Sequence, residues 1–145
     1  MKPEDVRQVA AIERDTFSQP WSEQGFLESL TNPDTLFLVA EGDTTQEESQ
    51  IMGYVGMYCA LDEGEITNVA VAQRFRKRGV GKGLIEELLG QAQEHEISRI
   101  VLEVRASNKP AIHLYNGMLF HKVGVRKGFY DFPKEDADIM VWEKD

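Results

Sequence analysis

Arg76-Lys77-Arg78-Gly79-Val80-Gly81-Lys82-Gly83 is the stretch that decides the fold, and it lies directly before a segment with helical spacing. The apolar residues of that segment recur three and four positions apart, as on one helix face, at Leu84, Ile85, Leu88, Leu89 and Ala92. Glycines let a backbone approach a ligand closely, and a helix start presents N–H groups and partial positive charge. With four cations in the same stretch, the pattern predicts a loop that binds phosphate or pyrophosphate.

Two common phosphate-binding loops do not fit these residues. A P-loop needs a glycine at the position of Arg76 and a serine or threonine at that of Gly83. The dinucleotide fingerprint needs a third glycine where the chain has Leu84. The pattern that remains is Arg-x-x-Gly-x-Gly, from Arg76 to Gly81. Taken alone, it also fits a simpler interpretation, a basic turn that caps a surface helix.

The surroundings of the loop make the pattern more specific. Ile66 to Val71 is a short β-rich run upstream, and Ile100 to Val104 is another downstream. An Asn-x-x-Ala-x-x-Leu-Tyr element follows at residues 108–115. In this order and spacing, these elements resemble the GNAT family of N-acetyltransferases. Residues 20–23, 102–108 and 135–140 look like its bacterial branch that acetylates the N-terminal alanine of a small-subunit ribosomal protein.

The resemblance spans roughly residues 17 to 142 and implies acetyl-CoA as the co-substrate. It implies that the coenzyme is bound by the strand segment Val69, Ala70 and Val71, by the loop residues Arg76, Lys77, Arg78, Gly79, Val80, Gly81, Lys82 and Gly83, and by Asn108 and Tyr115. The strand would pair with the pantetheine arm and offer a backbone N–H to the oxyanion. The chain departs from the family in opening with a helical pattern instead of a strand, and in having Met118-Leu119-Phe120 where Leu-Gly-Phe is usual.

Glu103 and Tyr115 are the candidate catalytic residues. Glu103 lies on the strand face opposite Ile100, Leu102 and Val104, where partial burial would raise the pKa of its carboxyl. Periodicity alone equally allows a Glu103 that pairs with Arg105. Tyr115 falls on an apolar helix face, which favours a packing role. The resemblance instead implies that Glu103 is the general base and that Tyr115 protonates the departing thiolate.

Aromatic segments at the two flanks are candidates for substrate binding. Trp21 lies near the front of the chain, and Tyr130 with Asp131 lies in an aromatic segment expected to form a loop between the last two strands. Trp21 fits equally well as a hydrophobic staple before a helix capped by Ser22. The residues do not decide whether Asp131 or Glu135 holds the substrate ammonium.

Length and composition limit the number of domains, the partners and the location to be expected of this chain. At 145 residues the chain is expected to form one GNAT domain, residues 1–145. Its net charge of −9 argues against direct nucleic-acid binding and suits a cationic peptide, such as the N-terminal segment of a ribosomal protein. No apolar run is long enough to cross a membrane, so a cytoplasmic location is expected. The lone Cys59 permits no internal disulfide, and the three histidines lack metal-ligand spacing, so we expect no metal.

The predicted architecture is α/β, a mixed central sheet flanked by helices. Helices are expected near 3–17, 22–31, 81–95 and 109–117, and strands near 35–41, 51–61, 65–71, 99–104, 120–127 and 137–142. The helix at 81 should connect parallel strands, the short loops should connect antiparallel ones, and residues 41–50 should form a hairpin loop without function. The activity expected first is N-terminal alanine acetylation by direct transfer in a ternary complex. Alternatives are acetylation of a lysine or small amine, and a non-catalytic acyl-CoA-binding module.

Overall fold

The computed structural model describes residues 1–42 and 50–144. Most of the predicted hairpin loop between Glu41 and Gln50 therefore lies outside the described residues. Within them, the strands form one six-stranded sheet in the order β1-β2-β3-β4-β6-β5. The strands are β1 (Thr35–Gly42), β2 (Gln50–Ala60), β3 (Glu63–Val71), β4 (Arg99–Arg105), β5 (His121–Tyr130) and β6 (Glu135–Glu143). Only β3 and β4 pair in parallel, which confirms the predicted crossover.

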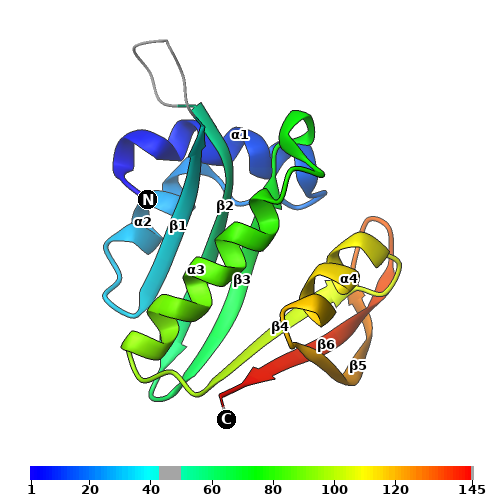
Figure 1. Cartoon of the computed structure of the whole chain (residues 1–145). Coiled ribbons are helices and arrows are strands. Elements are labelled where there is room, and N and C mark those ends of the chain that lie inside the picture. The colour runs from blue at the N-terminus through cyan, green and yellow to red at the C-terminus, as the bar shows by residue number, and fades with distance from the viewer. Residues whose placement is uncertain (43–49, 145) are drawn as a thin grey trace.

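The helices cover both faces of the sheet (Figure 1). They are α1 (Val6–Thr16), α2 (Glu23–Leu30), α3 (Val80–Glu94) and α4 (Lys109–Gly117), with short 3-10 turns at Pro3–Asp5 and Gln73–Phe75. Helices α3 and α4 lie over one face, α3 across β1 to β3 and α4 over β4 to β6, while α1 and α2 lie behind. No helix in the described part of the chain is both long and apolar enough to span a bilayer.

Two hydrophobic cores fill these layers. The α3-side core contains the predicted apolar stripe of α3 together with buried residues of β4, α4 and β6, among them Leu102, Tyr115 and Met140. The α1-side core joins α1 and α2 to β1 and β2 through Val9, Phe26 and Tyr54. The stripe predicted for α3 is thus confirmed, since its five residues are all buried in the α3-side core.

Several boundaries differ from the prediction, and three of them show the physical reason. The first helix is two elements, because the 3-10 turn precedes α1, and Phe17 is the residue after α1, 39 % exposed, instead of a core member. Strand β2 ends at Ala60, because Leu61 adopts a positive φ of 57° in the turn. Strand β5 extends to Tyr130, so Tyr130 ends a strand and only Asp131 to Lys134 form the turn. In each case the boundary depends on turn geometry, which apolar spacing does not encode.

A β-bulge and a separation of strands shape the middle of the sheet. Register between β2 and β3 passes from Met57↔Ile66 to Gly56↔Asn68, so Thr67 is an extra residue. The bulge changes which face each residue occupies: Ile66 belongs to the α3-side core, whereas Ala70 belongs to the α1-side core. Pairing between β3 and β4 covers only three positions and ends at Glu65↔Val101. Beyond that point the two strands diverge (Figure 1).

Candidate active site

The predicted phosphate loop leads into α3 beside the end of β3 that diverges from β4. Gly79 is the N-cap of α3 with φ 80°, a left-handed conformation that glycine adopts at little cost, and the N-cap provides no side-chain hydrogen bond. The first helical bond runs from the Gly83 N–H to the Gly79 carbonyl (3.0 Å). The N–H groups of Val80, Gly81 and Lys82 precede it, as donors of a helix start do. This helix start can accept an anion.

The glycines of the loop serve different purposes. A Cβ placed on Gly79 or Gly83 would meet no atom within 4 Å, so the backbone there is open to a ligand. A Cβ on Gly81 would lie 3.2 Å from Leu114 Cδ2, so this glycine lets the start of α3 pack closely against α4. Arg76 donates from Nε to the Val71 carbonyl (3.1 Å) and so ties the loop to the end of β3. Arg74 and Arg78 both lie over the Phe75 ring.

The segment Val69 to Val71 has an unpaired edge. These residues pair with Val55, Tyr54 and Gly53 of β2 on one side. On the other side, in the described residues, β3 has no strand partner after Glu65. Backbone N–H and C=O groups at such an edge are available to an extended ligand, which can pair with them as another strand would. The arrangement fits the thin pantetheine arm that the sequence led us to expect here.

Glu103 lies on the opposite face of β4 from the α3-side core, as the alternation predicted, and its side chain is only 14 % exposed. Its ion-pair partner is Arg126 of β5, whose Nε is 3.3 Å from Oε1. Arg105 instead pairs with Glu135 (3.3 Å), so the alternative pairing of Glu103 with Arg105 is wrong. Burial raises the pKa of the Glu103 carboxyl, Glu65 adds to the rise, and Arg126 opposes it. This is the direction that a general base near neutral pH requires.

Asn108 immediately precedes α4, and Tyr115 lies near the C-terminal end of the same helix. Tyr115 is 4 % exposed and packs against Phe120 with ring centroids 5.7 Å apart. Burial raises the pKa of its phenol, and Tyr130 adds to the rise. The Tyr115 hydroxyl makes no hydrogen bond within the described chain. Asn108 is the N-cap of α4, and its Oδ1 accepts from the Ala111 N–H (3.3 Å), a role that the sequence analysis missed.

Arg105 organises the turn that follows Tyr130. Its guanidinium lies 4.4 Å from the Tyr130 ring centroid and donates to the carbonyls of Asp131 (3.1 Å) and Pro133 (2.8 Å). Burial, together with Glu103, raises the pKa of Tyr130 to about 12. Glu135 accepts from the Ser107 N–H (2.8 Å), and hydrogen bonding with Ser107, from its side chain first and then its backbone, lowers the pKa of the Glu135 carboxyl. Glu135 is thus held by Ser107 and Arg105, whereas the Asp131 side chain is exposed.

Trp21 takes the structural role that the sequence allowed. Ser22 caps α2 by accepting from the Gly25 N–H (3.1 Å), and the Trp21 ring packs on Phe26 with centroids 5.3 Å apart. Trp21 precedes the cap and Phe26 is the fourth residue of the helix, which is the arrangement of a hydrophobic staple. The Trp21 side chain is half-buried against the α1-side core.

A buried polar network beside Trp21 was not foreseen. Glu13 of α1 is 2 % exposed and accepts hydrogen bonds from the Tyr54 hydroxyl, from Asn68 Nδ2 (3.2 Å to Oε2) and from the Trp21 N–H (2.8 Å). It therefore connects α1, the segment before α2, and strands β2 and β3. The only signal in the sequence is a carboxylate at a buried spacing of α1, next to Ile12, and spacing does not reveal its partners.

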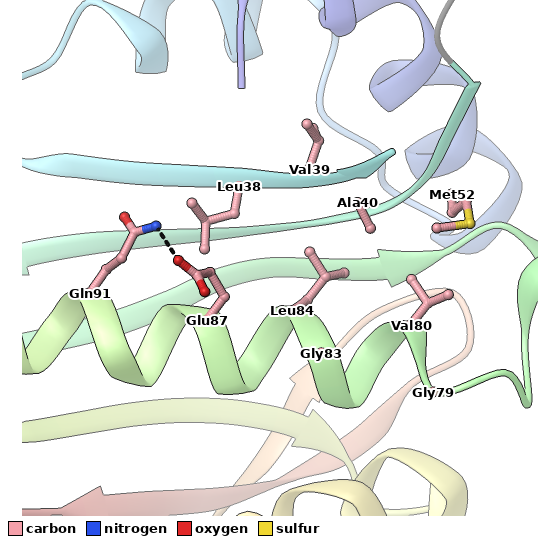
Figure 2. Close-up of a pocket in the computed structure, with 10 residues that line it drawn as sticks. All are labelled: Leu38, Val39, Ala40, Met52, Gly79, Val80, Gly83, Leu84, Glu87 and Gln91. Atoms are coloured by element: carbon pink, nitrogen blue, oxygen red, sulfur yellow. Dashed lines mark hydrogen bonds between the residues drawn. The ribbon is translucent and has the colours of Figure 1, made fainter. Parts of the chain in front are cut away.

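One groove in the surface borders the loop but lies away from Glu103 and Tyr115. A groove of about 430 Å³ runs between α3 and the edge strand β1, lined mainly by apolar side chains such as Leu38, Met52 and Leu84 (Figure 2). Gly79, Val80 and Gly83 border it, but Glu103 and Tyr115 do not. Its polar pair, Gln91 donating to Glu87 (2.9 Å), lies along the exposed side of α3. The candidate site lies at the separation of β3 and β4, where Tyr130 interacts electrostatically with both Glu103 and Tyr115.

Comparison with known proteins agrees with this architecture. Residues 6–118 match the model of the acetyltransferase (GNAT) family. The chain belongs to the GNAT family. A Bacillus subtilis protein that is provisionally named a ribosomal protein bS18-alanine N-acetyltransferase is 36 % identical over 97 % of this chain and 90 % of its own length. The family therefore identifies the protein as an acetyltransferase.

Two solved structures show that this GNAT chain has the fold of the family. The crystal structure of the Escherichia coli ribosomal-protein-S18-alanine N-acetyltransferase has a TM-score of 0.85 and 28 % identity, covering 99 % of this chain and 90 % of its own. Arabidopsis thaliana NAA60 in complex with acetyl-CoA has a TM-score of 0.88 at 24 % identity, covering 99 % and 95 %. At this identity, the similarity to NAA60 supports the fold and not the function.

Proposed function

We propose that this enzyme transfers the acetyl group of acetyl-CoA directly to the N-terminal alanine of ribosomal protein bS18 in a ternary complex. The observation that carries the proposal is the position of Glu103, a largely buried carboxylate with a raised pKa at the separation of β3 and β4. The names of the relatives from B. subtilis and E. coli support the choice of acceptor. Residues 1–145 act as one catalytic domain, in the cytoplasm where ribosomal proteins are made.

Acetyl-CoA supplies the thioester, and the residues of the chain bind the coenzyme. The open helix start at Val80 to Lys82, with Arg76 to Arg78 and Lys82 as cations, holds the pyrophosphate, and the free edge at Val69 to Val71 holds the pantetheine arm. A backbone N–H of that edge stabilises the oxyanion. Asn108 would contact the coenzyme by donating a hydrogen bond from Nδ2, since its Oδ1 already accepts the bond that caps α4.

Glu103 removes the proton that keeps the acceptor amine from attacking. An α-ammonium has an ordinary pKa of about 7.7–8.0 and a lysine ammonium about 10.4, so deprotonating lysine at pH 7 costs roughly 3.5 kcal/mol more. A single carboxylate with a moderately raised pKa is adequate for an N-terminus. This difference favours an N-terminal alanine over a lysine side chain.

Tyr115 returns a proton to the leaving thiolate. A free thiol has an ordinary pKa of about 8.5, so a phenol can assist its departure by donating a hydrogen bond and then the proton. Burial of Tyr115 keeps the phenol protonated, because its pKa is raised. Tyr130, Asp131 and Trp21 wall the acceptor side, with the Tyr130 turn fixed by Arg105.

Radiolabelled acetyl-CoA tests the proposal directly. The enzyme is incubated with a mixture of small-subunit ribosomal proteins that lack N-terminal acetylation, and mass spectrometry then locates the label. Label on the N-terminal alanine of bS18, absent with Glu103→Gln, supports the proposal. Label on lysine side chains would show a lysine acetyltransferase instead. Binding of acetyl-CoA without any transfer would show a non-catalytic module.

A further inference from the structure

Glu65 is a charged residue near Glu103 to which the proposed mechanism gives no role. It is the last residue of β3 to pair with β4, opposite Val101, and Glu103 lies two residues beyond Val101. Since side chains two positions apart share a face, Val101 and Glu103 project to the same side of β4, and Glu65 projects to that side of β3. The two carboxylates therefore stand on one face, on either side of the point where the strands diverge.

The charges around this pair are unequal. Glu63, two residues before Glu65 on the same face, pairs with Arg99 at 3.1 Å. The Glu65 side chain is exposed and forms no hydrogen bond or ion pair within residues 1–42 and 50–144. Glu103 faces Glu65 from β3, Arg126 and Tyr130 from β5, and the uncharged Ile139 of β6, while Arg105 on its own strand is paired with Glu135. Within the described residues Glu103 has a cation partner, Arg126, and Glu65 has none, so an arriving ammonium would supply the cation that Glu65 lacks.

We propose that Glu65 is a positioning residue of the acceptor site, which draws the ammonium of the substrate to the separation of β3 and β4 and holds it against Glu103. This inference rests on the proposed function for the identity of the reaction. Because Glu65 is exposed and Glu103 is largely buried, the outer carboxylate meets the cation first and the inner one takes its proton. A like charge nearby also makes Glu103 a stronger base, because it disfavours the ionised form.

Two charge-matched variants on one strand test the role. Glu65→Gln and Glu63→Gln remove the same charge from the same face, but only Glu65 adjoins Glu103. The pKa of the Glu103 carboxyl is measured by a carbon-13 NMR titration of the free protein, with Glu103→Gln identifying the signal. We expect Glu65→Gln to lower this pKa and Glu63→Gln to leave it unchanged.

Steady-state kinetics with a synthetic peptide that begins with alanine provides the second measurement. Glu65→Gln should raise KM for the peptide about two- to fivefold, the range expected of an exposed ionic contact, and leave KM for acetyl-CoA unchanged. The difference should vanish near 1 M salt, where the screening length is about 3 Å.

The results separate the two ideas. An unchanged Glu103 pKa together with an unchanged peptide KM in Glu65→Gln would overturn the role of Glu65, and so would equal effects from Glu63→Gln. Wild-type protein that acetylates no alanine peptide would overturn the proposed function instead. The titration needs no turnover, so it still decides whether Glu65 acts on Glu103.

Discussion

Glu103 is subject to opposing influences: burial, with Glu65 adding to it, favours the protonated form of its carboxyl, whereas Arg126 favours the charged form. Burial is the larger, so the pKa lies above the ordinary value and the acidic limb of kcat/KM should lie above about pH 4.3. Activity rises as pH increases through this pKa, because only the carboxylate accepts a proton. We expect Glu103→Gln to lower kcat about 100-fold or more and to abolish that limb. Calorimetry should show unchanged acetyl-CoA affinity, and near-normal turnover across pH 6 to 9 would make Glu103 structural.

Removing one atom, the Tyr115 hydroxyl oxygen, can distinguish a proton-donor role of Tyr115 from a packing role. Tyr115→Phe keeps the ring that packs on Phe120 and removes a hydroxyl with no hydrogen bond in the described residues, so stability should change by about 1 kcal/mol or less. As a proton donor, the hydroxyl should contribute about 100- to 10,000-fold to turnover. Release of free coenzyme A and the melting temperature are measured on the same variant. Unimpaired release would refute the proton-donor role.

Individual residues were predictable where a single strand or helix determines them. Alternation alone placed Glu103 off the core face of its strand, and helical spacing placed Tyr115 in the core. Partners supplied by distant segments were not predictable: Arg126 comes from a strand about twenty residues further along, and the Glu13 network joins residues up to 55 positions apart. Spacing reports which face a residue occupies, not which segment the fold brings against it.

At the scale of elements, the order and type of helices and strands followed from periodicity, and their ends did not. The bulge at Thr67 was missed because residues 66–71 show no regular alternation of polar and apolar side chains in which a shift of one position could be seen. Yet the bulge and the early end of β3–β4 pairing create the free edge of the candidate site. The loop was predictable because its glycines and cations are contiguous in the chain.

Adding a single methyl group at Gly79 should disturb the backbone at the start of α3 and weaken the binding of acetyl-CoA. Gly79→Ala forces a side chain into the left-handed region at a cost of about 1–2 kcal/mol, so the N–H groups of the first turn should shift and acetyl-CoA affinity should fall. Gly90→Ala is the control, since Gly90 is exposed in the same helix with open space around its Cβ position. This control should gain up to about 1 kcal/mol of stability with unchanged affinity. Calorimetry and thermal unfolding of both variants make the comparison, and equal affinities would remove Gly79 from the coenzyme site.

At the scale of the whole molecule, charge is distributed unevenly. The chain carries a net charge of −9, yet four cations fall within residues 76–83, where the phosphates are expected to bind. The face opposite α3 and α4, where we propose that the acceptor binds, carries Glu103 and also Glu65, whose side chain has no ion-pair partner in the described residues. An anionic donor and a cationic acceptor would thus be drawn to different places on one small protein.

This separation predicts opposite salt responses for two acceptor peptides. A peptide that begins with alanine and continues with lysines should lose kcat/KM as salt increases, because screening weakens its attraction to the acidic protein. A peptide of equal length that continues with glutamates should start lower and gain, because the same screening relieves its repulsion. Both are measured at saturating acetyl-CoA, so that the response of the basic loop does not enter the comparison. Parallel responses of the two peptides would show that net charge does not guide the acceptor, and that contacts other than charge, such as those proposed for Tyr130, select it.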